Sequence, residues 1–155
     1  MRYNFLRGEI LFMKSKIITC FLILIFCVSI SYAELQKFGN FSVDVPIGWD
    51  ANLQGSTLVI KSHNTNASIA VAFNRMGDAD FTDIVERLYL QMDGTDLEQD
   101  KDGDYSFNFR NSSGVDGVVL VTMAEDYYLV LSMTGVDEED KDIDTILDSI
   151  DWNDE

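Results

Sequence analysis

The pattern of apolar and polar residues is most regular between Val115 and Gly135, in the second half of the chain. Two apolar runs, Val118–Ala124 and Tyr127–Met133, are rich in β-branched and aromatic residues and flank a short acidic turn. This arrangement predicts a β-hairpin. Both sides of the first strand carry apolar residues, so both of its faces require a covering layer. We therefore predict that the hairpin lies at the centre of a sheet.

Shorter alternating segments predict four more strands. The first begins at Phe41 and ends at Pro46, because proline has no backbone N–H to donate to a neighbouring strand. The Ile47–Trp49 segment that follows is expected to be a turn, and Asp93–Asp104 an acidic connection. The other three strands are expected at Thr57–Lys61, Ser68–Phe73 and Tyr105–Arg110.

Two segments have the three- and four-residue spacing of apolar positions that is typical of amphipathic helices. Asp80 is placed to cap a helix over Asp80–Asp93, and Gly94 supplies its stop signal. Asp137 is placed to cap a second helix over Asp137–Ile150. Together with the strands, these helices predict an α+β fold, in which a single antiparallel sheet is flanked by two helices.

Residues 1–33 follow a different pattern. Lys14 and Lys16 precede an unbroken apolar run, Ile17–Ile30, and small residues stand at Ser31 and Ala33. This order of positive, apolar and small residues is typical of a secretory signal peptide that is cleaved after Ala33. The apolar run is shorter than the roughly 20 residues that a membrane span requires. An uncleaved anchor is the alternative interpretation.

The leader pattern starts more naturally at Met13 than at Met1, which leaves two candidate start sites. No internal repeat, linker or low-complexity segment divides residues 34–155, so we predict a single domain there. On this interpretation the mature protein is periplasmic or secreted. It has no stable membrane anchor once the leader is removed.

Removal of the leader changes the composition. Both cysteines, Cys20 and Cys27, lie within it, so disulfides, thiolate catalysis and cysteine-ligated zinc are excluded from residues 34–155. The leader also holds four of the eleven basic and one of the twenty-seven acidic residues, which leaves seven against twenty-six and a net charge of −19. Such a charge disfavours nucleic acid and anionic lipid as partners. It fits a protein partner with a basic surface, a cation-rich environment, or solubility alone.

The acidic connection contains a sequence that resembles the start of a calcium loop. Asp100, Asp102 and Asp104 stand at alternate positions. An EF-hand loop also needs glycine at its sixth position and glutamate at its twelfth, but Tyr105 and Asn111 stand there. We therefore interpret this segment as a solvated acidic turn, and we predict no cofactor or metal site.

The single histidine, His63, follows Ser62, and aspartates are abundant, so a Ser–His–Asp arrangement is conceivable. The serine lacks the Gly-x-Ser-x-Gly elbow of a hydrolase nucleophile, and the histidine lies in a polar turn. Glycosidases use a pair of carboxylates. With twenty-six acidic residues in 34–155, such a pair would arise by chance, so its presence does not indicate this activity. We therefore assign no catalytic residue.

Two features near the ends of the domain have two interpretations each. Trp49 and Trp152 are placed either as lids on the core, which we favour, or as surfaces on which a ligand stacks.

The second helix ends in acidic residues, although a helix C-terminus favours cations. This acidic end is either a salt-screened tail or a surface for a basic partner, and it comprises Asp148, Asp151, Asp154 and Glu155.

Three segments of the sequence together resemble PsbP-like domains. They read FSVDVPIGW from Phe41, YSFNFRNSSGVDGVVLVTMAEDYYLVLSMTG from Tyr105, and ILDSIDW from Ile146. Within this family group, the sequence is most similar to small exported bacterial proteins of DcrB type. The resemblance spans Phe41–Trp152 and implies an α/β/α sandwich. It further implies a protein that acts by binding other proteins, and it assigns no functional residue in this chain.

Two functional hypotheses follow from these observations. The first is a non-catalytic exported binding or accessory protein that acts through protein–protein contact, with a basic surface on its partner. The second is a small periplasmic hydrolase or metal-dependent enzyme. Its only support is the presence of serine, histidine and aspartate residues that form no recognisable motif. A cleft with converging polar groups around His63 would favour the second hypothesis.

The leader pattern generates a direct prediction about processing. Mass spectrometry of the protein purified from the cell envelope should show Glu34 at its N-terminus, because cleavage is expected after Ala33. A mass that includes the leader would refute this prediction.

Overall fold

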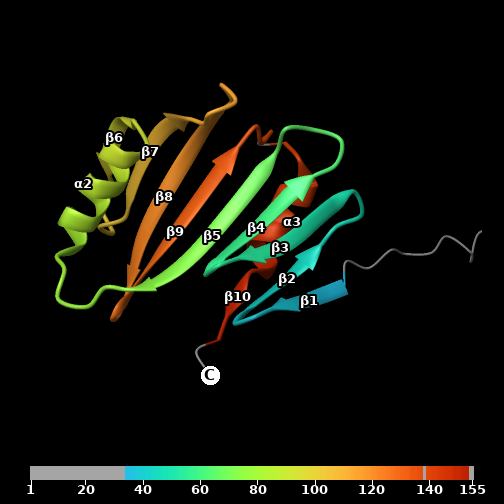
Figure 1. Cartoon of the computed structure of the whole chain (residues 1–155), viewed down its shortest axis with the longest axis horizontal. Coiled ribbons are helices and arrows are strands. Elements are labelled where there is room, and N and C mark those ends of the chain that lie inside the picture. Colours follow the sequence, from blue (N-terminus) through green and yellow to red (C-terminus); the bar gives the residue numbers. More distant parts are fainter. Residues whose placement is uncertain (1–33, 138, 154–155) are drawn as a thin grey trace, which may run out of the picture. The chain divides into compact units, whose positions relative to one another are not determined.

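The computed structural model describes residues 34–137 and 139–153. The expected signal peptide, residues 1–33, lies outside this part of the chain, so its cleavage stays a prediction. The described residues form ten strands and two helices, labelled β1 to β10, α2 and α3 (Figure 1). None of these helices has the length and apolar character needed to cross a bilayer.

Seven strands form the main sheet, and every neighbouring pair is antiparallel. The strand order is β3-β4-β5-β9-β8-β7-β6, so the β8–β9 hairpin lies in the middle, as predicted. The strands are β3 (Trp49–Gln54), β4 (Thr57–Ser62), β5 (Ser68–Arg75), β6 (Thr95–Gln99), β7 (Tyr105–Arg110), β8 (Asp116–Ala124) and β9 (Tyr127–Thr134).

A second, three-stranded sheet has the order β1-β2-β10, so the expectation of a single sheet is wrong in this respect. It contains β1 (Glu34–Phe38), β2 (Phe41–Val45) and β10 (Asp151–Trp152). The chain leaves β2 through a turn in which the Trp49 amide donates to the Pro46 carbonyl at 3.1 Å. β10 pairs with β2 from the opposite end of the sequence, a long-range contact that local periodicity does not reveal.

Helix α2 (Phe81–Gln91) begins as predicted, with Asp80 as its N-cap. The Asp80 carboxylate accepts a hydrogen bond from the Thr82 amide at 2.8 Å. The helix packs on the side chains of one face of the main sheet. The buried residues of this cluster are Val85, Phe107, Val119 and Val121.

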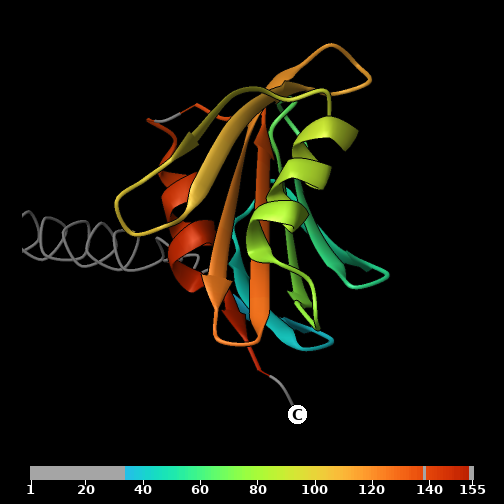
Figure 2. The same ribbon diagram turned by 90° about the vertical axis from the view of Figure 1, so that its left-hand side faces the viewer.

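Helix α3 (Lys141–Ser149) is shorter than predicted, and its N-cap is Asp140 rather than Asp137. Several acids precede this helix, so more than one of them could have been its cap. Asp137 lies in the preceding turn, where it accepts a hydrogen bond from the Glu139 amide. α3 and the small sheet pack on the other face of the main sheet, opposite α2 (Figure 2). The α+β class, with helices on both faces of an antiparallel sheet, is therefore confirmed.

Two of the expected connections contain strand. The expected turn at Ile47–Trp49 runs into β3, and the acidic connection at Asp93–Asp104 contains β6, an edge strand. All five residues of β6 are exposed, so this strand has no buried face and no apolar alternation to identify it.

The packing of β8 against α2 generates a stability prediction. Val121 is fully buried, so Val121→Asp should prevent folding, because burial of an unpaired carboxylate costs several kcal/mol against a total stability of about 5–15 kcal/mol. Met123→Asp is the matched control, since Met123 lies two residues further along the same face and is 52% exposed. Thermal unfolding followed by circular dichroism checks both variants. If Val121→Asp melts like the parent, the central position of β8 is wrong.

Candidate functional site

The two faces of the central strands are covered to different extents. On the α2 side of β8, Val119 and Val121 are fully buried. On the α3 side, Val118, Leu120 and Thr122 remain half-buried. In β9 the first seven residues are half-buried on both faces, so the difference between the faces is seen in β8. The apolar surface of the hairpin therefore stays partly open on the α3 side.

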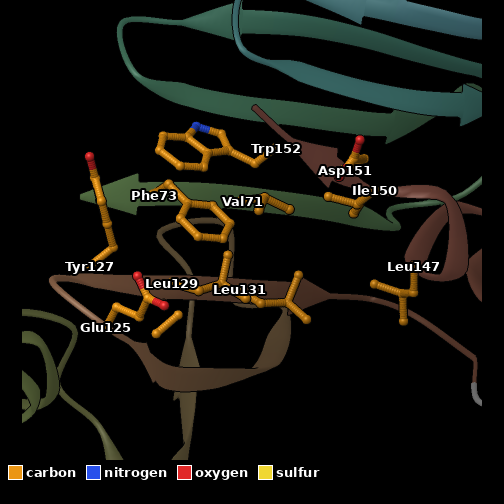
Figure 3. A pocket seen from close by; sticks show the side chains of 11 residues that line it. Val71, Phe73, Glu125, Tyr127, Leu129, Leu131, Leu147, Ile150, Asp151 and Trp152 are labelled. Carbon is orange, nitrogen blue, oxygen red and sulfur yellow. The ribbon is translucent and has the colours of Figure 1, made fainter. Parts of the chain in front are cut away.

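A groove of about 770 Å³ opens on this side, between β5, β9 and the end of α3 (Figure 3). Its volume falls within the range of ligand-binding pockets, roughly 300–1,000 Å³. We call it the aromatic groove. It is lined by Val71, Phe73, Ala124, Glu125, Tyr127, Leu129, Leu131, Leu147, Ile150, Asp151 and Trp152.

Three aromatic rings form one end of the aromatic groove (Figure 3). The rings of Phe73 and Trp152 are stacked, with centroids 4.7 Å apart and planes 6° from parallel. The Tyr127 ring lies 5.1 Å from that of Trp152, tilted by 59°. Arg75, which is exposed, donates to the Tyr127 hydroxyl at 3.0 Å and lies over its ring. The rings thus support one another and present a broad apolar wall.

Contacts between the two ends of the domain hold Trp152 in this position. Trp152 pairs with Phe41 in the small sheet, and the Asn153 amide donates to the Asn40 carbonyl at 2.9 Å. The end of α3 is attached to the same sheet, because the Ser149 hydroxyl accepts a hydrogen bond from the Asp44 amide at 2.9 Å. The wall of the groove therefore depends on the pairing of β10 with β2.

Two acidic side chains line the groove, and they are the charged ones among its described lining residues. Glu125 lies in the β8–β9 turn and Asp151 follows α3. Asp148 lies in the last turn of α3, which contains no basic residue. The negative end of the helix dipole adds to these charges. Asp151, a member of the acidic end identified in the sequence, thus lines the groove, whereas Asp154 and Glu155 lie outside the described residues.

A smaller hollow of about 430 Å³ lies further along the same strands. It is lined by Asn108, Val115, Asp116, Gly117, Val118, Met133, Gly135 and Val136. The register pairs Val118 with Met133 and Leu120 with Leu131, so these side chains share the α3 side of the sheet. We call this connecting surface the β8–β9 strip, and it comprises Val118, Leu120, Leu129, Leu131 and Met133.

One ion pair borders this second hollow. Arg110 Nε and Asp116 Oδ1 are 2.7 Å apart, and both side chains are exposed. The hydrogen bond from the guanidinium, supported by its charge, lowers the pKa of Asp116 below its ordinary value. The Asp116 carboxylate, at this end of the strip, is therefore already paired with a cation, whereas Glu125 and Asp151 have no ion pair with any other residue of 34–137 and 139–153.

The structure brings His63 together with an aspartate. His63 Nε2 lies 2.7 Å from Asp50 Oδ2, and the two side chains are 51% and 75% exposed. The Ser62 hydroxyl instead accepts a hydrogen bond from the Asn64 amide at 3.3 Å. This exposed pair lies outside the aromatic groove, since none of its residues lines it.

The acidic segment Asp100–Asp104 forms the turn between β6 and β7. Asp100 Oδ1 accepts hydrogen bonds from the amides of Asp102 and Asp104, at 2.8 and 3.0 Å. One carboxylate oxygen therefore stabilises the local backbone. Within residues 34–137 and 139–153, no three acidic, histidine or cysteine side chains form a group that could hold a metal ion.

The two tryptophans have different roles. Trp49 is 7% exposed and its indole N–H donates to Asp142 Oδ2 at 3.2 Å, so its predicted place in the core is confirmed. Trp152 packs on Phe73 and at the same time lines the groove. The sequence did not predict the groove, although the hairpin that is apolar on both faces indicated a surface that needs a cover.

An antiparallel sheet with one helix on each face, and with a small sheet beside one helix, defines a PsbP-like α+β fold. The solution structure of cyanobacterial PsbP (CyanoP) from Synechocystis sp. PCC 6803 is similar, with a TM-score of 0.52 and 16% sequence identity. The similarity covers 82% of this chain and 97% of that chain, and it supports the fold. No family model and no curated protein matches the sequence.

The geometry of the acidic turn generates a prediction about calcium. Calorimetry in physiological salt should detect at best millimolar, salt-sensitive binding. Calcium prefers six to eight oxygen ligands, and the turn supplies fewer. Asp100→Asn should leave this weak heat unchanged. A saturable micromolar site that disappears in Asp100→Asn would overturn the prediction.

Proposed function

We propose that this protein is a non-catalytic, exported accessory protein that acts through contact with another protein. We also propose that it belongs with the small exported bacterial proteins of DcrB type and is periplasmic or secreted. The leader pattern and the resemblance in sequence support these two statements. The observation that carries the functional proposal is the half-open apolar surface on the α3 side of β8 and β9.

Central strands are normally covered on both faces by other parts of the same domain. Here α2 fully buries Val119 and Val121 of β8, whereas on the α3 side the β8–β9 strip beside the aromatic groove is only half-buried. Continuous apolar surfaces of this kind on soluble proteins typically mark interaction sites. A partner that covers the strip would complete the packing that the fold leaves unfinished.

The charge of the chain supports a basic partner. A net charge of −19 over residues 34–155 creates a field that attracts positive surfaces and repels nucleic acid and anionic membranes. Such a field acts mainly on the rate of association. The apolar surface then provides the contact that retains the partner.

The enzyme hypothesis is the second candidate, and the His63–Asp50 pair is the observation in its favour. An aspartate that orients a histidine is one part of a hydrolytic triad. Both side chains of the pair are exposed, and the Ser62 hydroxyl accepts a hydrogen bond from the Asn64 amide. We therefore rank the binding function first.

The proposal predicts a salt-dependent interaction with a protein of the cell envelope. The immobilised protein should retain a partner from envelope extract at low salt, and association should slow roughly tenfold or more as salt rises while dissociation changes little. Neutralising Asp148, Asp151 and Asp154 together should weaken capture, whereas His63→Ala should not. Surface plasmon resonance on the retained protein measures both rates. Recovery of no partner, together with a turnover activity that His63→Ala abolishes, would reverse the ranking of the two functions.

A further inference from the structure

We infer that the aromatic groove and the β8–β9 strip together bind a segment of a partner protein in which large apolar residues are flanked by lysine or arginine. This inference rests on the proposed function and adds the location of the contact and the chemistry of the occupant. It draws on the length of the apolar surface and on the distribution of charge around it.

The apolar surface is too long for a small molecule. β9 has eight residues, which span about 26 Å at 3.3 Å per residue. The aromatic groove, of about 770 Å³, is lined by Tyr127, Leu129 and Leu131 of this strand, and the second hollow, of about 430 Å³, is lined by its Met133. Leu129 and Met133, which line the two hollows, are four residues apart, or about 13 Å. Two apolar side chains of one peptide, at this separation, would fill both hollows.

The two ends differ in charge. Glu125 and Asp151 line the aromatic groove, and none of the described residues in its lining is a lysine or arginine. Arg75 is the basic residue at this end, and it is engaged with Tyr127. At the other end Asp116 is paired with Arg110. A basic side chain of the occupant would therefore be favoured beside the aromatic groove, and a fatty acid carboxylate would be repelled there.

The backbone of β8 and β9 is already paired on both sides, so the occupant cannot add as a further strand at this place. Side chains must provide the contact. Large apolar anchors in hollows, with charges at the rim, are the usual arrangement of energetically dominant contacts in protein interfaces.

The chain's two tryptophans provide a specific measurement. In ¹⁵N-labelled protein, the indole signal of Trp152 reports on the groove, and that of Trp49, which donates to Asp142, is an internal control. The probe is a synthetic sixteen-residue peptide of leucine and lysine in low salt. Matched peptides replace all lysines by glutamate or all leucines by serine, and laurate represents a fatty acid.

We expect the leucine–lysine peptide to shift the Trp152 indole and the amides of β8 and β9, with little effect on the Trp49 indole. Both substituted peptides should bind at least tenfold more weakly, and laurate should leave Trp152 unshifted. Equal binding of the glutamate peptide, shifts that avoid β8 and β9, or laurate binding in place of the peptide would overturn the inference.

Variants test the strip and its rim separately. Leu131→Lys should weaken the peptide at least tenfold, whereas Leu53→Lys, at an exposed leucine of the edge strand β3, should not. The double variant Glu125→Gln/Asp151→Asn should weaken binding several-fold more than Asp83→Asn/Glu86→Gln, which removes the same charge from α2 on the opposite face. Equal losses in the two double variants would assign the effect to net charge and overturn the proposed rim.

The same variants separate this inference from the proposed function. If an envelope partner binds Leu131→Lys as tightly as the parent, the partner uses another surface, and only the location and chemistry inferred here fall. If no partner is captured at all and a His63-dependent turnover is found, the proposed function itself falls.

Discussion

The requirement that both faces of the β8–β9 hairpin be covered governs the rest of this structure. The hairpin is apolar on both sides, and it holds the middle of a seven-stranded sheet. α2 meets the requirement on one face, where Val119 and Val121 are fully buried. On the other face the buried core lies between α3, the small sheet and β3 to β5, and Leu129, Leu131 and Met133 of β9 pack against it while only half-buried. The position of the candidate site follows from this unequal coverage.

The elements that the sequence predicts well are those with a local pattern. The hairpin alternates regularly, and α2 combines an apolar stripe with an aspartate cap, so both are found where expected. β6 escaped prediction because it is an edge strand with no buried residue. β10 has only two residues, and its pairing with β2 depends on the whole fold. The groove was not predictable either, since its depth depends on where α3 ends relative to the strands.

The two functional hypotheses concern different parts of the surface, and this separation makes them experimentally distinct. The His63–Asp50 pair connects exposed side chains near the ends of β3 and β4. The aromatic groove lies between β5, β9 and α3, and its lining is largely apolar with two acids at its rim. A PsbP-like fold accommodates either function, because a fold places elements in space while chemistry depends on the side chains at a site. For this chain the apolar surface at the centre of the sheet is the stronger local feature.

The pairing of β10 with β2 also bears on how the protein reaches its folded state. One of the first strands of the domain has one of its last as a neighbour, and the Phe73–Trp152 stack joins the middle of the chain to residue 152. Contacts between such distant residues slow folding, because a long loop must close before they form. The three-stranded sheet cannot be completed until residues 151 and 152 have been synthesised. A growing polypeptide with this topology therefore has its first strands ready long before their last partner emerges from the ribosome.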